Sequence, residues 1–361
     1  MKKYKVGILG ATGMVGQNYI KLLENHPWFD VIYLGASANS AGKKYKDAVA
    51  LRWVMSTPIP ENIKNIIVED VVEVVKAKEC DFVFSAFEMP DKKLIKEIEE
   101  KYASVDIAVV SNASANRSTP DVPMLIPEIN PEHLEMIKTQ QKNHGWKKGF
   151  IVVKPNCSIQ SFLTPIYALE QAGYSIDKIM TTTMQAISGA GYPGVPSLDM
   201  IDNVVPFIGG EEEKTEQEPL KILGKIINGK FVDKKNLKIS ATCTRVPVTD
   251  GHTAVVNILF KDKKPSKEEI LKIWKDFKGE PQKLKLPFAP FSPIIYIEEE
   301  NRPQPKKDRD IDKGMAVIIG RLRECNVFDY KFVALSHNTI RGAAGGGILN
   351  AELLVKKGYI K

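Results

Sequence analysis

The sequence predicts a two-domain fold: an α/β domain built on a parallel sheet, followed by an α+β domain with a mixed or antiparallel sheet. A length of 361 residues suits two domains, at about 100–200 residues per domain. In the first half, short apolar strands alternate with helical stretches, which is typical of a parallel sheet with helices on both faces. In the second half, the strand-like runs are richer in Thr and alternate between apolar and polar residues, which indicates the other kind of sheet.

The first half opens with a strand and a helix. Residues 4–9 predict a short buried strand, and an amphipathic helix then runs to about residue 26, where Pro27 ends it. The other elements predicted in this half are strands at 31–34, 81–86, 107–111 and 149–153 and a helix at 91–102.

The second half carries less regular elements. Pro165 lies inside a predicted helix at 158–172, where it either kinks the helix or shifts its start. A final helix at 347–358 either closes the second domain or returns to the first. The remaining predictions are strands at 178–187, 237–248, 253–260 and 315–322 and helices at 211–224 and 266–277.

Composition and charge exclude several classes of protein. Hydrophobic residues make up 43% of the chain and charged residues 26%, which is ordinary for a globular protein with a core. The net charge of +7 comes from scattered lysines, which indicates a solvated surface or the steering of anionic ligands. The chain has no basic stripe with interleaved aromatics, and no apolar run reaches the roughly 18 residues of a membrane span. We therefore expect neither a nucleic-acid partner nor a membrane partner.

The spacing of the four cysteines matches no metal-binding template and no disulfide framework. Reduced thiols in the cytoplasm fit this pattern best. The apolar stretch near the N-terminus is too short for a signal peptide and runs into glycines, which also favours a cytoplasmic location.

A glycine-rich turn joins the first strand to the first helix. Gly10, Gly13 and Gly16 stand at a variant of the spacing that lets a backbone approach a pyrophosphate closely. The helix that follows offers free N–H groups and the positive end of its dipole. The alternative is a tight turn that binds no nucleotide. The position within the first strand, turn and helix favours a Rossmann-like dinucleotide site.

The residues after the second strand favour NADP over NAD. Enzymes that use NAD usually place a carboxylate there, on the ribose hydroxyls. This chain has Ser37, Asn39, Ser40 and Lys43 instead, with no carboxylate before Asp47. Such groups suit a 2′-phosphate, although an ordinary polar loop would look the same.

Cys157 follows a strand and stands at the predicted start of a helix. This position favours the thiolate and can lower the pKa of a cysteine from about 8.5 into the range of about 3.5–7.5. A thiolate is the nucleophile that covalent acyl chemistry requires. A buried structural cysteine is the alternative, and it is our interpretation of the other three, Cys80, Cys243 and Cys325.

Three polar residues accompany the cysteine at predicted strand ends. His252 follows an Asp-Gly turn, and Arg245 lies near the start of the same connection, so that one cleft could receive both side chains. Histidine transfers protons near neutral pH, although His252 could also be a solvated loop residue. Gln185 precedes the glycine-rich segment 188–194, which suits either a mobile loop at a site or a plain turn.

A set of motifs covers nearly the whole chain and is specific only in combination. The motifs are GATGMVG at 10–16, SNASANR at 111–117, PNCS at 155–158, MQAISGAGYPGVPS at 184–197, EEEK at 211–214, RVPVTDGH at 245–252 and HNTIRGAAGG at 337–346. Together they resemble the aspartate-β-semialdehyde dehydrogenases of archaea and fungi.

The resemblance implies a fold and an assembly. Residues 1–156 and 338–361 would form a Rossmann-like NADP-binding domain, to which the last helix returns. Residues 157–337 would form an α+β catalytic and dimerisation domain, in a homodimer or homotetramer. Many relatives carry Arg where this chain has Asn39, which removes one partner of the 2′-phosphate and leaves use of NAD open.

The resemblance also implies the roles of individual residues. Cys157 would be the nucleophile, His252 the acid/base, and Gln185 the residue that orients the substrate. Arg245 would bind the substrate α-carboxylate in bidentate fashion. Glu211 would meet the α-ammonium group.

Phosphate and cofactor contacts follow in the same way, with no metal. Lys214, Arg117 and Asn112 would hold the phosphate, although Lys214 and Glu211 by themselves are an ordinary i,i+3 ion pair. The residues that would contact NADP are Gly10, Thr12, Gly13, Met14, Val15, Gly16, Ser37, Ser40, Ser188, Gly189 and Asn338.

The implied reaction is the reversible, NADPH-dependent reduction of aspartyl 4-phosphate to aspartate semialdehyde through a thioester of Cys157, in the biosynthesis of Lys, Thr and Met. The alternative is malonyl-CoA reductase, an archaeal branch that resembles this chain in GYPGVPS and GGGILNAELLVKKGYI. That branch lacks EEEK and replaces the Asn before the cysteine, whereas this chain keeps Asn156, Glu211 and Lys214. A non-catalytic NADP-binding sensor would not need the cysteine and its partners.

Overall fold

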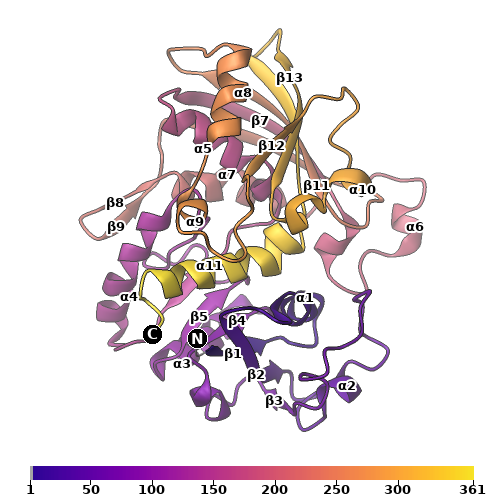
Figure 1. The fold of residues 1–361 in the computed structure, drawn as a ribbon, viewed down its shortest axis with the longest axis vertical. Coiled ribbons are helices and arrows are strands. Elements are labelled where there is room, and N and C mark those ends of the chain that lie inside the picture. Colours follow the sequence, from indigo (N-terminus) through magenta and orange to yellow (C-terminus); the bar gives the residue numbers. More distant parts are fainter. Residues whose placement is uncertain (1–2) are drawn as a thin grey trace.

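The first sheet has six parallel strands in the order β3-β2-β1-β4-β5-β6 (Figure 1). From β1 the chain adds β2 and β3 on one side and β4, β5 and β6 on the other, so the strand order switches between β1 and β4, where doubly wound folds bind dinucleotides. A computed structural model describes the chain over residues 3–361. The strands are β1 (Tyr4–Leu9), β2 (Phe29–Ala36), β3 (Val68–Asp70), β4 (Phe82–Ser85), β5 (Ala108–Ser111) and β6 (Ile151–Val153).

The helices of this half lie between the strands in the chain. They are α1 (Met14–Leu23), α2 (Tyr45–Ala48), α3 (Lys92–Ser104) and α4 (Met136–His144). Single 3-10 turns occur at Lys76–Glu79 and Pro131–Glu135. The alternation of strands and helices that the sequence predicted is confirmed, except that α1 ends at Leu23, three residues early.

The second sheet is mixed and has the order β10-β7-β11-β14-β13-β12. The pairs β10/β7 and β13/β12 are parallel, and the other neighbours are antiparallel. This arrangement confirms the predicted α+β domain. The strands are β7 (Ile176–Gln185), β10 (Lys238–Arg245), β11 (His252–Phe260), β12 (Ile294–Ile297), β13 (Val317–Glu324) and β14 (Tyr330–Ser336).

One face of this sheet is covered and the other is open. On β7, Ile179 and Thr181 are buried, whereas Lys178, Met180 and Thr182 between and beside them are exposed. Residues of α5 (Leu163–Gln171) and α8 (Lys267–Asp276) share the core with the buried side of the strands (Figure 1). Buried and exposed residues therefore alternate along β7 because only one face of the sheet is covered.

The remaining elements surround the second sheet. They are α6 (Ser197–Met200), α7 (Glu211–Ile222), α9 (Glu280–Lys283), α10 (Pro305–Asp308), the hairpin β8 (Lys225–Ile227) and β9 (Lys230–Val232), and short turns at Ile187–Ala190 and Ile311–Gly314. The sequence predicted α7, but it did not predict the hairpin, β3, β12, β14 or α4, which are short or lack a clear period.

Pro165 shifts the start of its helix. A 3-10 turn spans Ser158–Ser161, and α5 begins only at Leu163, so that Pro165 is its third residue. The N–H groups of a first helical turn have no partner within the helix, and a proline there loses no hydrogen bond. The carbonyl of Pro165 accepts a hydrogen bond of 3.0 Å from the Trp274 indole.

The last helix, α11 (Gly345–Lys356), packs against the first domain. It follows a π-helical turn at Ile340–Ala344 and runs between the two sheets (Figure 1). Its Leu349 and Leu353 share a core with Ile8 of β1. Of the two courses that the sequence left open for this helix, the structure shows the return to the first domain. None of the helices between residues 3 and 361 has the length and apolar character that a membrane crossing needs.

Candidate active site

The turn after β1 fits a pyrophosphate. Gly10 has φ +80°, and a Cβ there would lie 2.7 Å from the backbone nitrogen of Phe87. A Cβ on Gly16 would lie 2.3 Å from the carbonyl oxygen of Gly10, so only glycine permits this close approach. No side chain caps α1 at Gly13, and the N–H groups of its first turn point out of the helix end.

The loop after β2 carries the residues predicted for the 2′-phosphate. Ser37, Asn39 and Lys43 are exposed, and the Lys43 ammonium donates to the carbonyl of Asn39 at 2.9 Å. Ser40 is buried, and its backbone N–H donates to the carbonyl of Ser37 at 2.8 Å. Ser37 is therefore the better placed of the two serines to meet a ligand.

The sequence did not predict that two carboxylates lie near this loop, because it did not predict β3. Glu69 and Asp70 lie on β3 in register with the last residues of β2. Lys76 bonds both oxygens of Glu69 at 2.7 Å, and Asp70 accepts from the backbone N–H of Val72 at 3.1 Å. Both carboxylates therefore already have partners within the protein.

Ser188 and Asn338 come from distant parts of the chain and meet. The Asn338 amide donates to the Ser188 hydroxyl at 2.8 Å, and its oxygen accepts from the N–H of Gly251. Gly189 lies beside them, and a Cβ there would be 2.6 Å from a guanidinium nitrogen of Arg245. These three residues predicted to contact the cofactor thus border the residues predicted to bind substrate.

Cys157 and His252 form a hydrogen-bonded pair. The distance between Sγ of Cys157 and Nε2 of His252 is 3.3 Å. The backbone N–H of Ala186 donates to Nδ1 of His252 at 3.0 Å, so Nδ1 is an acceptor and Nε2 of the neutral ring carries the hydrogen. Burial, with Arg245 nearby, lowers the pKa of His252 to about 3. The imidazole is therefore a neutral donor to the sulfur.

The pKa of Cys157 contradicts the sequence expectation. Burial raises it to about 11, and Glu211 raises it further, against Lys154 and two arginines that lower it. The segment after Cys157 is the single 3-10 turn Ser158–Ser161 rather than the first turn of a long helix. Such a short segment has a small dipole, which does not overcome burial.

Glu211 begins α7 and gathers several side chains. Its carboxylate accepts from Asn156 at 2.9 and 3.0 Å, from Gln185 at 3.2 Å and from Lys214 at 3.0 Å. Burial raises the pKa of Glu211, but Lys214 and these hydrogen bonds outweigh it and give a net lowering. Glu211 is thus a buried carboxylate held ionised, and not half of a solvated pair.

Arg245 is the last residue of β10, and it hydrogen-bonds the same residue, Ala186, that hydrogen-bonds His252. One of its nitrogens donates to the carbonyl of Ala186 at 2.8 Å, while the N–H of the same residue bonds His252. The guanidinium is buried, which lowers its pKa. Arg245, His252 and Cys157 therefore lie in one cluster, as the sequence predicted.

Arg117 is joined to the cysteine loop through Glu218, which the sequence analysis missed. Glu218 accepts from Arg117 at 3.0 Å and, through its other oxygen, from the N–H of Asn156 at 2.6 Å. Glu218 lies four residues after Lys214 on α7, and this helical spacing is the signal that could have identified it.

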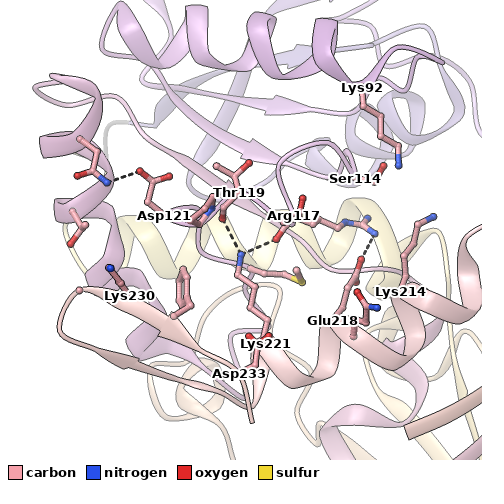
Figure 2. Close-up of a pocket in the computed structure, with 18 of the residues that line it drawn as sticks. Lys92, Ser114, Arg117, Thr119, Asp121, Lys214, Glu218, Lys221, Lys230 and Asp233 are labelled. Carbon is pink, nitrogen blue, oxygen red and sulfur yellow. Dashed lines mark hydrogen bonds and ion pairs between the residues drawn. The ribbon is translucent and has the colours of Figure 1, made fainter. Parts of the chain in front are cut away.

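Arg117 and Lys214 reach the same cavity, which has a volume of about 1100 Å³ (Figure 2). Asn112 contributes its carbonyl to Arg117 at 3.1 Å, while its side-chain oxygen accepts from Tyr19 at 3.3 Å. The side chain of Asn112 thus faces α1. The cavity wall therefore brings together two of the three residues predicted to hold phosphate.

The sequence assigned no function to Asn116. In the structure, Asn116 anchors the segment 111–117 to a buried carboxyl of α3. It donates to the buried carboxyl of Glu99 at 2.7 Å, and the Ser111 hydroxyl donates to the other oxygen at 2.5 Å. Burial raises the pKa of Glu99. A single carboxyl on α3 thus ties down both ends of the segment 111–117.

The fold and the cluster define a dinucleotide-binding protein with a Cys–His pair at the junction of its two domains. Residues 5–137 match the family described as semialdehyde dehydrogenase, NAD binding domain, and residues 164–341 match semialdehyde dehydrogenase, dimerisation domain. The aspartate-semialdehyde dehydrogenases of Aspergillus fumigatus and Archaeoglobus fulgidus are 46% and 47% identical to this chain. The alignments cover 99% of this chain and 99% and 100% of those proteins. The chain belongs to the aspartate-semialdehyde dehydrogenase family.

A solved structure agrees with this assignment. The aspartate-semialdehyde dehydrogenase from Candida albicans, solved with NADP, is 42% identical and has a TM-score of 0.90, covering 99% of this chain and 100% of that chain. The family and the fold class predicted from the sequence are therefore confirmed. These relatives are fungal and archaeal, as the resemblance implied.

Proposed function

We propose that the chain catalyses the reversible, NADPH-dependent conversion of L-aspartyl 4-phosphate into L-aspartate 4-semialdehyde and phosphate, a step in the biosynthesis of Lys, Thr and Met. The observation that carries this proposal is the cluster of Cys157, His252, Arg245 and Glu211 within a chain that matches the family over its full length. The cluster offers a nucleophile, a donor, a cation and an anion, which are the groups that an amino-acid acyl substrate requires.

The α-carboxylate and the α-ammonium group of the substrate each have a proposed binding residue of opposite charge. Arg245 binds the α-carboxylate, since a buried guanidinium with one nitrogen on Ala186 has further donors for a carboxylate. Glu211 binds the α-ammonium group, and Gln185, which already donates to Glu211, orients the substrate beside the thiol. Arg117 and Lys214 hold the phosphate at the wall of the cavity.

NADP fits the first domain. Gly10 and Gly16 leave room for the pyrophosphate, and Thr12 to Val15 surround the open end of α1. Ser37 faces the 2′-phosphate, and Ser188 and Asn338 border the nicotinamide end. When bound, the reduced cofactor supplies the hydride that converts the thioester into the aldehyde level.

The residues of the chain carry the other steps. The Cys157 thiolate attacks the acyl carbonyl, the C–O bond to phosphate breaks, and the departing phosphate is received by Arg117 and Lys214. The Nε2–H of His252 stabilises the oxyanion at the reacting carbon, together with backbone N–H groups near Cys157. After reduction, the C–S bond breaks, which releases the aldehyde and restores the thiolate.

The assembly and the domain boundaries are part of the same proposal. Residues 1–156 with 338–361 form the NADP-binding domain, and residues 157–337 the catalytic domain. The open face of the second sheet, with Met180 45% exposed on β7, is the proposed contact of a homodimer or of each pair in a homotetramer. Four free cysteines support a cytoplasmic location.

An assay of NADP reduction tests the proposal. The purified protein is given aspartate semialdehyde and phosphate, with NAD as alternative cofactor, and malonyl-CoA with NADPH in parallel. Phosphate-dependent formation of NADPH is expected. Oxidation of NADPH by malonyl-CoA, without activity towards aspartate semialdehyde, would move the chain to the CoA-reductase branch.

Replacement of Ser37 by Asp should reverse the cofactor preference. The new carboxylate would repel a 2′-phosphate and could accept from the ribose hydroxyls of NAD instead. We expect kcat/KM with NADP to fall at least about tenfold, equivalent to about 1.4 kcal/mol, while kcat/KM with NAD is kept or rises. Ser37→Asn is the uncharged control. An equal fall with both cofactors would show that Ser37 does not contact the 2′ position.

A further inference from the structure

Glu218 of α7 connects the proposed phosphate site to the loop that carries the nucleophile. One oxygen of its carboxylate accepts from a terminal nitrogen of Arg117 at 3.0 Å, and the other accepts from the backbone N–H of Asn156 at 2.6 Å. The side chains of Glu218 and Arg117 are only 8% and 13% exposed, so solvent screens this ion pair little. One buried carboxylate therefore sets where the guanidinium lies relative to the peptide before Cys157.

Arg117 depends on α7 for the position of both its backbone and its side chain. The Lys221 ammonium donates to the carbonyl of Arg117 at 2.8 Å and to that of Thr119 at 3.2 Å, as Figure 2 shows. The guanidinium is held by Glu218 through one terminal nitrogen and by the carbonyl of Asn112 through the other. These two bonds leave further N–H donors of the guanidinium for a phosphate.

Asn156 is fixed by the same helix. Its side-chain amide donates to both oxygens of Glu211, at 2.9 and 3.0 Å. Glu211 precedes Glu218 by about two helical turns, so both carboxylates project from one face of α7. The amide oxygen of Asn156 accepts from the backbone N–H of Ser158 at 2.7 Å. The residues on either side of Cys157 are thus attached to α7 through Asn156.

The charge of Glu218 by itself opposes the binding of phosphate. An anion beside Arg117 offsets part of the positive charge that attracts a phosphate group. Lys214, the other residue proposed to bind phosphate, is likewise paired with Glu211 at 3.0 Å. A carboxylate in this place favours phosphate binding only by fixing the orientation of the planar guanidinium.

We propose that Glu218 is a positioning residue for the phosphate: it directs the guanidinium of Arg117 into the cavity and, through Asn156, fixes it relative to Cys157. Glu218 acts through these two partners. The inference rests on the proposed function for the roles of Arg117 and Cys157.

Replacement of Glu218 by Gln tests the inference. An amide of the same shape has one oxygen that accepts and one nitrogen that only donates. The oxygen should stay with the N–H of Asn156, because a buried backbone donor is costly to leave without a partner, whereas Arg117 can turn within the cavity. The amide nitrogen then faces the guanidinium and displaces it. We expect KM for phosphate to rise at least about tenfold, while KM for aspartate semialdehyde changes less than about threefold.

The direction of the change separates orientation from charge. If Glu218 acted through its charge alone, its removal would strengthen the attraction for phosphate and lower KM. Glu218→Asp is a second variant, which keeps the charge but shortens the side chain by one methylene, so that it cannot span both partners. It should also raise KM for phosphate. A lowered or unchanged KM for phosphate in either folded variant would overturn the inference.

Glu216→Gln is the matched control on the same helix. Glu216 also accepts a backbone N–H, that of Ala241 on β10 at 3.0 Å. This control should leave both KM values unchanged, and an equal rise in KM for phosphate would contradict a specific role for Glu218.

Isothermal titration calorimetry with inorganic phosphate gives the same comparison without turnover. Kd for phosphate should rise at least about tenfold in Glu218→Gln and stay at the wild-type value in Glu216→Gln. Equal phosphate affinity in wild type and Glu218→Gln would overturn the inference. Because this measurement needs no catalysis, its result is distinct from the NADP assay that tests the proposed function.

Discussion

Replacement of Cys157 by Ser should remove phosphate-dependent NADPH formation, with a fall in kcat of at least about 10⁴-fold. A hydroxyl is a nucleophile only when a base takes its proton. The His252 ring cannot act as that base while Nδ1 accepts from Ala186, because Nε2 already carries a hydrogen. Serine is therefore expected to be nearly as inactive as alanine at this position. Initial rates with aspartate semialdehyde, phosphate and NADP measure the effect.

Cys325→Ser is the matched control for this experiment. Cys325 is also a free and partly exposed cysteine, but it follows β13, and its thiol lies 3.7 Å from the Asn257 side-chain oxygen. The control should keep the wild-type rate. A Cys157→Ser enzyme that retained more than about a hundredth of the rate would contradict the expectation that turnover requires the thiol.

Replacement of His252 by Ala should lower kcat by about 10²–10³-fold, the usual cost of losing one donor to an oxyanion. Because burial lowers the pKa of His252 to about 3, the ring is neutral above that pH and becomes charged only below it. The factor lost should therefore be the same at pH 6 and at pH 8. Steady-state kinetics at both values, with thermal unfolding to check the fold, measure this.

The outcome at different pH values separates a donor from a titrating base. A loss that grows between pH 6 and pH 8 would show that His252 changes its protonation state in this range and takes up the thiol proton itself. Lys272→Gln is the control, since Lys272 is an exposed residue of α8 that pairs with Asp276 and should leave kcat unchanged.

Local patterns predicted the parts of the site that are continuous in the chain. The turn at 10–16 needed only the order of strand, glycines and helix, and Cys157 needed only its place after a strand. The alternation along β7 likewise follows directly from burial of one face. These features depend on neighbours in sequence, which is why the sequence alone could indicate them.

The parts that were missed depend on contacts between distant residues. Glu218 is an ordinary glutamate on a polar helix until the fold brings Asn156 and Arg117 to its two oxygens. Glu99 lies on a helix that looks solvated, and only the buried Ser111 hydroxyl and Asn116 amide reveal its role.

The pKa of Cys157 was predicted wrongly for the same reason. The sequence showed a helix to follow but not the depth of burial or the proximity of Glu211.

The peptide of Ala186 restricts how this enzyme could evolve. Its carbonyl accepts a hydrogen bond from Arg245, which is proposed to bind the substrate's carboxylate. Its N–H donates to His252, whose ring contacts the sulfur of Cys157. A change at Arg245 that admits a different acid would also release one side of this peptide and disturb the orientation of His252. Specificity and turnover are therefore inherited together, and a lineage that acquires a new substrate must rebuild both through one backbone unit.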